Sequence, residues 1–268
     1  MFELYVGSKR INMNVLKFLG TAGARFVVMK QLRASGGLWL TLDGTHVLVD
    51  PGPGALIRCL SSRPKLDPQD LEGIILTHRH LDHSNDINIM IEAMTNGGFK
   101  KKGVVFAPGD ALEGDPVILK YCRDQVDRIE ILKEKGQYQV GNISFETPIR
   151  LKHGVETYGI NVKGKTSSIS LITDTDYFTD LASYFTGDIL IVNVVMLQDK
   201  NTIEHLCLQE AEQIIKANKP RLAILTHFGM GLVKAKPWEI AENLTQKLGV
   251  TVIAARDGMQ IDIDQYTK

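Results

Sequence analysis

The chain has 268 residues, of which 44% are hydrophobic and 23% charged, and its 31 basic and 31 acidic residues give no net charge. Such a composition is ordinary for a soluble globular protein whose core is large enough to need no disulfide bonds. A balanced charge argues against a protein whose main task is to grip long nucleic acid, because phosphate contacts require a basic excess. The N-terminal residues contain no long apolar run, which argues against a signal peptide or a membrane span.

The three cysteines are scattered and odd in number: Cys59, Cys122 and Cys207. They form no disulfide framework and therefore favour a reducing, cytoplasmic location. No repeat, low-complexity tract or linker interrupts the chain, so a single domain is predicted over residues 1–268.

A strand is predicted at residues 15–19, ended by Gly20. Residues 24–36 follow as an irregular stretch containing Arg25, Lys30 and Arg33. This stretch is interpreted either as a solvated loop or as a flexible flap whose cations could meet an anionic substrate.

An Asp-Gly pair at residues 43–44 lies between two apolar runs and predicts a β-hairpin. His46, at the shoulder of this hairpin, is interpreted as a surface residue. A short helix and a helical turn are expected over residues 55–62 and 68–72, ahead of a central strand.

The densest chemical signal follows that strand. An apolar run at residues 74–76 leads into four ligand-type residues within six positions: His78, His80, Asp82 and His83. A loop at a strand end can turn several side chains toward one point, and neutral imidazole and carboxylate are ligands that suit zinc. A histidine-rich surface loop is the alternative, which this density makes less favourable.

The next segments read as ordinary secondary structure. Apolar residues at helical spacing predict a helix near residues 85–94, and Pro116 stands at an expected first helical position. Three strands are predicted at residues 128–132, 137–140 and 143–146.

The second half of the chain places further polar residues at strand ends. His153 follows the three strands, Asp174 follows an apolar strand at 168–172, and His227 ends another at 222–226. A helix is expected over residues 237–248, with proline near its start and Gly249 at its end. Two apolar runs then flank Asp257 and Gly258, which predicts a terminal hairpin.

The pattern His78-x-His80-x-Asp82-His83 resembles the signature of the metallo-β-lactamase fold superfamily. This resemblance implies an α/β fold, a four-layer αβ/βα sandwich in which two mixed β-sheets are flanked by helices. It covers nearly the whole chain from about residue 14 onward.

The resemblance also implies a centre of two divalent metal ions, with zinc as first choice and Mn²⁺ or Fe²⁺ as alternatives. The ligands that it implies are His78, His80 and His153 for one ion, Asp82, His83 and His227 for the other, and Asp174 shared between them. Asp174 is chosen over its rival Asp176 because it directly follows the strand and precedes a threonine, as in the family. Asp50 takes the family position beneath the metals that orients a ligand.

Within the superfamily, the chain resembles the ribonuclease Z and phosphodiesterase branch. The glycine-threonine turn at residues 20–21, followed by Arg33 and Ser35, is one likeness, and His205 ahead of a Glu-Ala pair is another. In that branch the histidine contacts the scissile phosphate or protonates the leaving group. Cys207 stands where the branch usually has serine or threonine.

The resemblance thus implies a phosphodiesterase that attacks a small phosphodiester, a cyclic nucleotide or a short RNA end through a metal-bridging hydroxide. Asp82 and His205 are the expected catalytic residues. The alternatives are a lactone or thioester hydrolase of the same fold and a non-catalytic metal-binding member. No long Gly/Pro-rich arm lies between His83 and His153, so a small-molecule or short-oligonucleotide substrate is expected; the oligomeric state stays open, a homodimer included.

Overall fold

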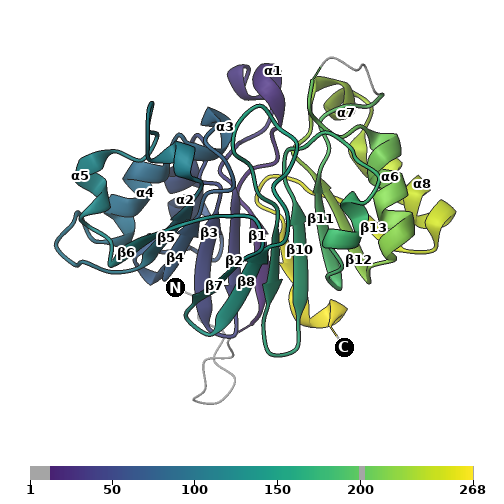
Figure 1. The fold of residues 1–268 in the computed structure, drawn as a ribbon. Coiled ribbons are helices and arrows are strands. Elements are labelled where there is room, and N and C mark those ends of the chain that lie inside the picture. The colour runs from purple at the N-terminus through teal and green to yellow at the C-terminus, as the bar shows by residue number, and fades with distance from the viewer. Residues whose placement is uncertain (1–12, 199–202, 268) are drawn as a thin grey trace.

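Two seven-stranded β-sheets face each other in the computed structural model, which describes residues 13–198 and 203–267. Helices cover the outer face of each sheet (Figure 1). The predicted sandwich of two mixed sheets flanked by helices is confirmed.

The first sheet has the strand order β14-β1-β2-β3-β4-β5-β6. Its strands are β1 (Val15–Phe18), β2 (Leu38–Leu42), β3 (Thr45–Val49), β4 (Gly73–Ile75), β5 (Val104–Ala107), β6 (Arg128–Ile131) and β14 (Gln260–Asp262). The helices that accompany it are α1 (Ala24–Met29), α2 (Ala55–Ser61), α3 (Leu81–Ser84), α4 (Ile87–Met94) and α5 (Lys120–Arg123).

The second sheet has the order β13-β12-β11-β10-β9-β8-β7. Its strands are β7 (Gly136–Val140), β8 (Ile143–Thr147), β9 (Ile160–Lys163), β10 (Ser168–Ile172), β11 (Ile189–Asn193), β12 (Leu222–Thr226) and β13 (Thr251–Ala254). Its helices are α6 (Leu208–Asn218), α7 (Met230–Lys234) and α8 (Pro237–Leu248).

Apolar side chains from both sheets fill the space between them. Leu16 and Phe18 of β1 belong to the same buried cluster as Ile191 of β11. Phe106 of β5 meets Phe145 of β8 edge to face, with ring centroids 4.8 Å apart. Strand alternation therefore sends one set of side chains into this central layer and the other set toward the helices.

Several of the predicted site residues follow strands that pair in parallel within each sheet. Strands β3 to β6 pair in parallel, and so do β10 to β13. Their carboxyl ends lie at one edge of the sandwich, where α3 follows β4 and α7 follows β12, at the top of Figure 1. Loops from both sheets consequently meet at that edge.

The hairpin predicted at residues 43–44 is confirmed, since β2 and β3 pair antiparallel. Asp43 and Gly44 both adopt positive φ, at 51° and 79°. Such a turn matches the twist of the flanking strands, which explains why an Asp-Gly pair suits it.

The predicted terminal hairpin is wrong. β13 pairs with β12 in the second sheet, whereas β14 pairs with β1 in the first. Asp257 therefore lies where the chain crosses between sheets, and its carboxylate accepts hydrogen bonds from the Thr21 hydroxyl at 2.8 Å and from the Ala34 amide at 2.7 Å. These bonds to a distant segment replace the local pairing that a hairpin would need.

Two further predictions of local structure also fail. Residues 24–36 contain the helix α1, which buries Val27, rather than a wholly irregular flap. The helix expected at Pro116 begins only at Lys120, because Leu119 is extended, with ψ at 140°, and its amide donates to Asn88 Oδ1 at 2.8 Å.

None of the helices formed by the described residues is long and apolar enough to cross a membrane.

Candidate metal centre

The motif after β4 is held in a buried loop that runs into α3. His78 is fully buried, His80 occupies the position before the first turn of α3, and Asp82 and His83 lie within that turn. The helix is only one turn long, so it serves here to place Asp82 and His83 side by side rather than to build the core. The side chains of Asp82 and His83 face residues from the second sheet.

The second sheet contributes its residues from strand ends and the loops beyond them. The structure brings all seven predicted ligands and His205 into neighbouring groups at the shared edge of the sandwich. Within each group the ligand-type atoms lie within 4.8 Å of one another. The groups are His78, His80 and His153; Asp82, His83, Asp174 and His227; Asp50, His78 and His83; and His153, Asp174 and His205.

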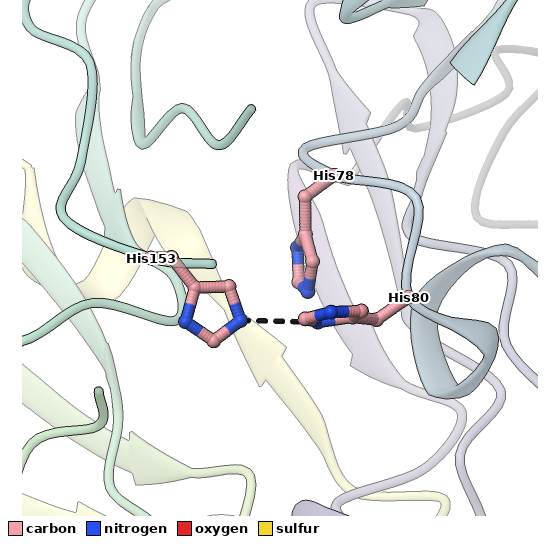
Figure 2. A group of neighbouring side chains, drawn as sticks. All are labelled: His78, His80 and His153. Carbon is pink, nitrogen blue, oxygen red and sulfur yellow. Dashed lines mark hydrogen bonds between the residues drawn. The ribbon is translucent and has the colours of Figure 1, made fainter. Parts of the chain in front are cut away.

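Three histidines form the first group. His153 approaches from the side opposite His78 and His80, and the three rings point toward one another (Figure 2). His153 Nε2 lies 3.0 Å from His80 Nδ1, while its Nδ1 lies 3.0 Å from the Glu204 carbonyl oxygen. A carbonyl can only accept, so Nδ1 carries the proton and Nε2 presents a lone pair to the group.

The second group is centred on Asp174. Its Oδ2 lies 3.3 Å from the Nε2 atoms of both His83 and His227, and 3.7 Å from His78 Nε2. Asp82 Oδ2 lies 3.8 Å from His83 Nε2 and 3.5 Å from His227 Nε2. Asp174 therefore touches both groups, the position that a shared carboxylate requires.

Asp50 fixes the proton positions of two of these histidines. Its Oδ2 lies 2.9 Å from His83 Nδ1 and accepts a 2.7 Å hydrogen bond from the Thr77 hydroxyl. Because that hydroxyl donates to Asp50, it can only accept from His78 Nδ1, 3.1 Å away. Both rings thus carry a proton on Nδ1 and direct the Nε2 lone pair into the centre.

These lone pairs test whether the residues fit a metal. The Nε2 atoms of His78, His83 and His227 are buried and have no hydrogen-bond partner among the described residues. Buried polar atoms without a partner are costly, and here three converge beside two carboxylates. The donor set therefore fits a divalent cation bound by nitrogen and oxygen ligands.

The electrostatics of the centre favour positive charge. Burial lowers the pKa of His83, but Asp174, Asp82 and Asp50 outweigh it and raise that pKa well above its usual range. Burial opposes ionisation of Asp174, yet His227 and His83 hold its pKa well below the ordinary carboxyl range. The Asp174 carboxylate thus remains ionised. Its negative charge stabilises a cation at the centre, and a bound metal ion would supply that cation in place of a proton.

Asp50 offers a direct test of this arrangement. An Asp50→Asn variant keeps the shape of the side chain but removes the negative charge that accepts the hydrogen bond from His83 Nδ1. Its metal affinity is therefore expected to fall about 10–100-fold. The measurement is competition with a chromogenic chelator at fixed pH. Unchanged competition in this variant would show that Asp50 supports only the turn that follows β3.

The loop that bears His227 is packed against the end of β1. His227 has a positive φ of 58°, and the Gly23 amide donates to the carbonyl of the next residue, Phe228, at 3.0 Å. A Cβ on Gly23 would lie 2.0 Å from the His227 carbonyl oxygen. Only glycine permits this approach, which holds His227 in an otherwise unfavourable conformation.

Arg33 does not offer its charge to a substrate as predicted for the flap. Its Nη1 donates to the Thr21 hydroxyl at 2.9 Å and to the Ala255 carbonyl at 3.0 Å. The guanidinium also lies over the Phe228 ring, 5.0 Å from its centroid. Arg33 therefore connects the segments that contain Thr21, Ala255 and Phe228, the residue next to His227.

His205 lies at the same centre, on the segment between β11 and α6. Its Nδ1 is 3.7 Å from Asp174 Oδ2, and its ring stands 5.0 Å from that of His153. Cys207, two residues later, is the N-terminal cap of α6 and forms a reciprocal capping box with Glu210. The thiol takes the capping position that a hydroxyl usually fills, and it belongs to none of the ligand groups.

Three supporting contacts were not anticipated from the sequence. Thr77 joins Asp50 to His78, the Glu204 carbonyl orients His153, and Asn193 Nδ2 donates to Asp174 Oδ1 at 2.9 Å. Thr77 directly precedes the motif and could have been suspected. The other two depend on contacts between distant loops and have no local signal.

The family is decided by a model of the β-lactamase superfamily domain, which matches residues 45–228. The chain belongs to the metallo-β-lactamase superfamily. The match spans the Asp50 turn, the histidine motif and the loops that bear His153, Asp174 and His227.

A sequence relative from Methanocaldococcus jannaschii, an uncharacterized protein, is 31% identical over 258 residues, covering 92% of this chain and 94% of the relative. The metallo-β-lactamase fold protein YhfI of Bacillus subtilis has a similar structure, with a TM-score of 0.76 at 18% identity, covering 93% of this chain and 99% of that protein. The short form of human tRNase Z is similar with a TM-score of 0.67 at 20% identity, covering 93% and 99% of the two chains. At these identities the structural similarities demonstrate the fold.

Proposed function

We propose that the chain is a binuclear metal-dependent phosphodiesterase that acts on a small phosphodiester, a cyclic nucleotide or a short RNA end. The observation that carries the proposal is the position of His205, beside Asp174 and His153 at the rim of the ligand groups. Similarity to the short form of human tRNase Z supports the same class of reaction.

The metal ligands of the proposal follow the two groups. His78, His80 and His153 would hold one ion, and Asp82, His83 and His227 the other, with Asp174 shared. Zinc suits this nitrogen-rich set, with Mn²⁺ and Fe²⁺ as alternatives. Two such ions, when bound, would activate a water molecule and neutralise charge on the phosphate.

The chain's own residues would handle the substrate and the protons. Burial lowers the pKa of His205 to about 4, so its imidazole is neutral near pH 7 and can donate a hydrogen bond to a phosphoryl oxygen. A bound phosphodiester anion would raise that pKa, so that His205 takes up a proton from solvent and can transfer it to the leaving alkoxide. Asp82, whose side chain is 20% exposed, is the candidate acceptor for the proton of the attacking water.

The test compares bis-p-nitrophenyl phosphate with a lactone and a thioester, using zinc-loaded protein. Phosphodiester turnover is expected, and His205→Ala should lower kcat about 100-fold or more while the metal content stays the same. His205→Asn retains an N–H donor and should keep part of the rate. Turnover of the carbonyl substrates alone, unaffected by His205→Ala, would instead support a lactone or thioester hydrolase.

A further inference from the structure

A lysine is buried on the outer face of the first sheet, away from the metal centre. Lys17 of β1 has only 5% of its surface exposed, and its neighbours Leu16 and Phe18 point to the opposite face, into the central core. The residue after β1 on the same side as Lys17, Leu19, packs into the apolar layer beneath α2. An apolar side chain would therefore be the expected occupant of the Lys17 position.

The ammonium group has few partners for its degree of burial. Its Nζ donates to the Arg63 carbonyl at 3.0 Å, whereas an ammonium has three donors. Ion pairs of lysine and arginine in the described parts of the chain involve other basic residues. Burial correspondingly lowers the pKa of Lys17, because a charge removed from water without a counter-charge is destabilised.

Lys17 lines a pocket of about 240 Å³ with an unusual balance of charge. The polar lining consists of Lys17, Arg58, Arg63, Ser61 and Ser62, with no acidic side chain. Arg58 and Arg63 are exposed to solvent. The serine hydroxyls already donate to the carbonyls of Ile57 and Pro64, so the three cations supply the positive character of the pocket.

We propose that this pocket binds the phosphate group of an anionic ligand. Three cationic residues lining one pocket match a multiply charged oxyanion, and guanidinium groups bind phosphate through paired, charge-assisted hydrogen bonds. Occupancy would give Lys17 the counter-charge that it lacks among the described residues. None of the lining residues belongs to the ligand groups of the metal centre, so the inference stands independently of the proposed function.

The experiment follows backbone amide resonances of zinc-loaded, ¹⁵N-labelled protein during titration with two probes. One is inorganic phosphate and the other a short 5′-phosphorylated oligonucleotide. Saturable shifts of the Ser62, Arg63 and Gly258 amides are expected, and the probe that binds more tightly identifies the source of the phosphate. Phosphate at the metal centre would instead shift amides near Asp82, which separates the two sites.

Variants at the exposed arginines test the assignment without disturbing the core. Arg58→Gln combined with Arg63→Gln should weaken binding at the pocket at least about tenfold. The matched control, Lys100→Gln with Lys101→Gln, removes two exposed charges elsewhere and should leave binding unchanged. Absence of saturable shifts at the pocket amides with both probes, or equal affinity in the arginine variant and the wild type, would overturn the proposal.

Discussion

Replacing His83 by alanine is expected to remove a metal ion and to lower hydrolysis about 1,000-fold or more. His83 Nε2 is buried, has no partner within the described chain and lies 3.3 Å from Asp174. Its loss would delete a ligand of the proposed metal centre and leave Asp50 without the imidazole that it orients. Metal chemistry is worth several kcal/mol of barrier, and each factor of ten in rate corresponds to about 1.36 kcal/mol.

The measurement is the metal-to-protein ratio by mass spectrometry, paired with turnover of the phosphodiester. His46→Ala is the matched control, because His46 lies outside the ligand groups, with its Nδ1 2.9 Å from the Thr41 hydroxyl. Both variants should show the circular dichroism of the wild type. An unchanged metal content in a folded His83→Ala protein would refute the assignment of this ligand.

The clustering of the ligand-type residues was predictable from the sequence wherever such a residue directly follows a strand. Residues 74–76 form an apolar run that ends in the motif, and Asp174 and His227 each come one or two positions after a buried strand. Parallel strands bring their carboxyl ends to one edge, so this local signal carries information about distant neighbours. His153 lacked such a signal, because it lies in a loop several residues after β8 ends at Thr147. Its assignment needed the family resemblance, and its ring is oriented by the carbonyl of the distant residue Glu204.

The sequence predictions failed where a segment that satisfies a local rule forms its contacts with a distant part of the chain. The Asp-Gly pair at 257–258 satisfies the hairpin rule, yet β14 finds its partner at Val15–Lys17, near the other end of the chain. Arg33 lies in a stretch whose cations could have faced a substrate. Its guanidinium instead contacts Thr21, Ala255 and Phe228. In both cases tertiary hydrogen bonds, which no local pattern encodes, determine the outcome.

Replacing Asp174 by asparagine is expected to reduce the metal content and to abolish most activity, again by about 1,000-fold or more. The Oδ2 atom of Asp174 is the point where four imidazoles converge: it lies 3.3–3.7 Å from His78, His83, His205 and His227. Asparagine can still accept the hydrogen bond from Asn193. Its amide nitrogen, however, would face the centre and present donors where a cation needs an anionic oxygen.

Asp176→Asn provides the control that decides between the two carboxylates. Asp176 is exposed and lies outside the ligand groups of the described chain, so its variant should keep both metal content and turnover. Metal content and kcat are measured together, because a bridging carboxylate affects both, whereas a purely structural residue would lower only the fraction of folded protein. Full metal occupancy in a folded Asp174→Asn variant would contradict the shared-ligand role, and metal loss in Asp176→Asn would transfer that role to Asp176.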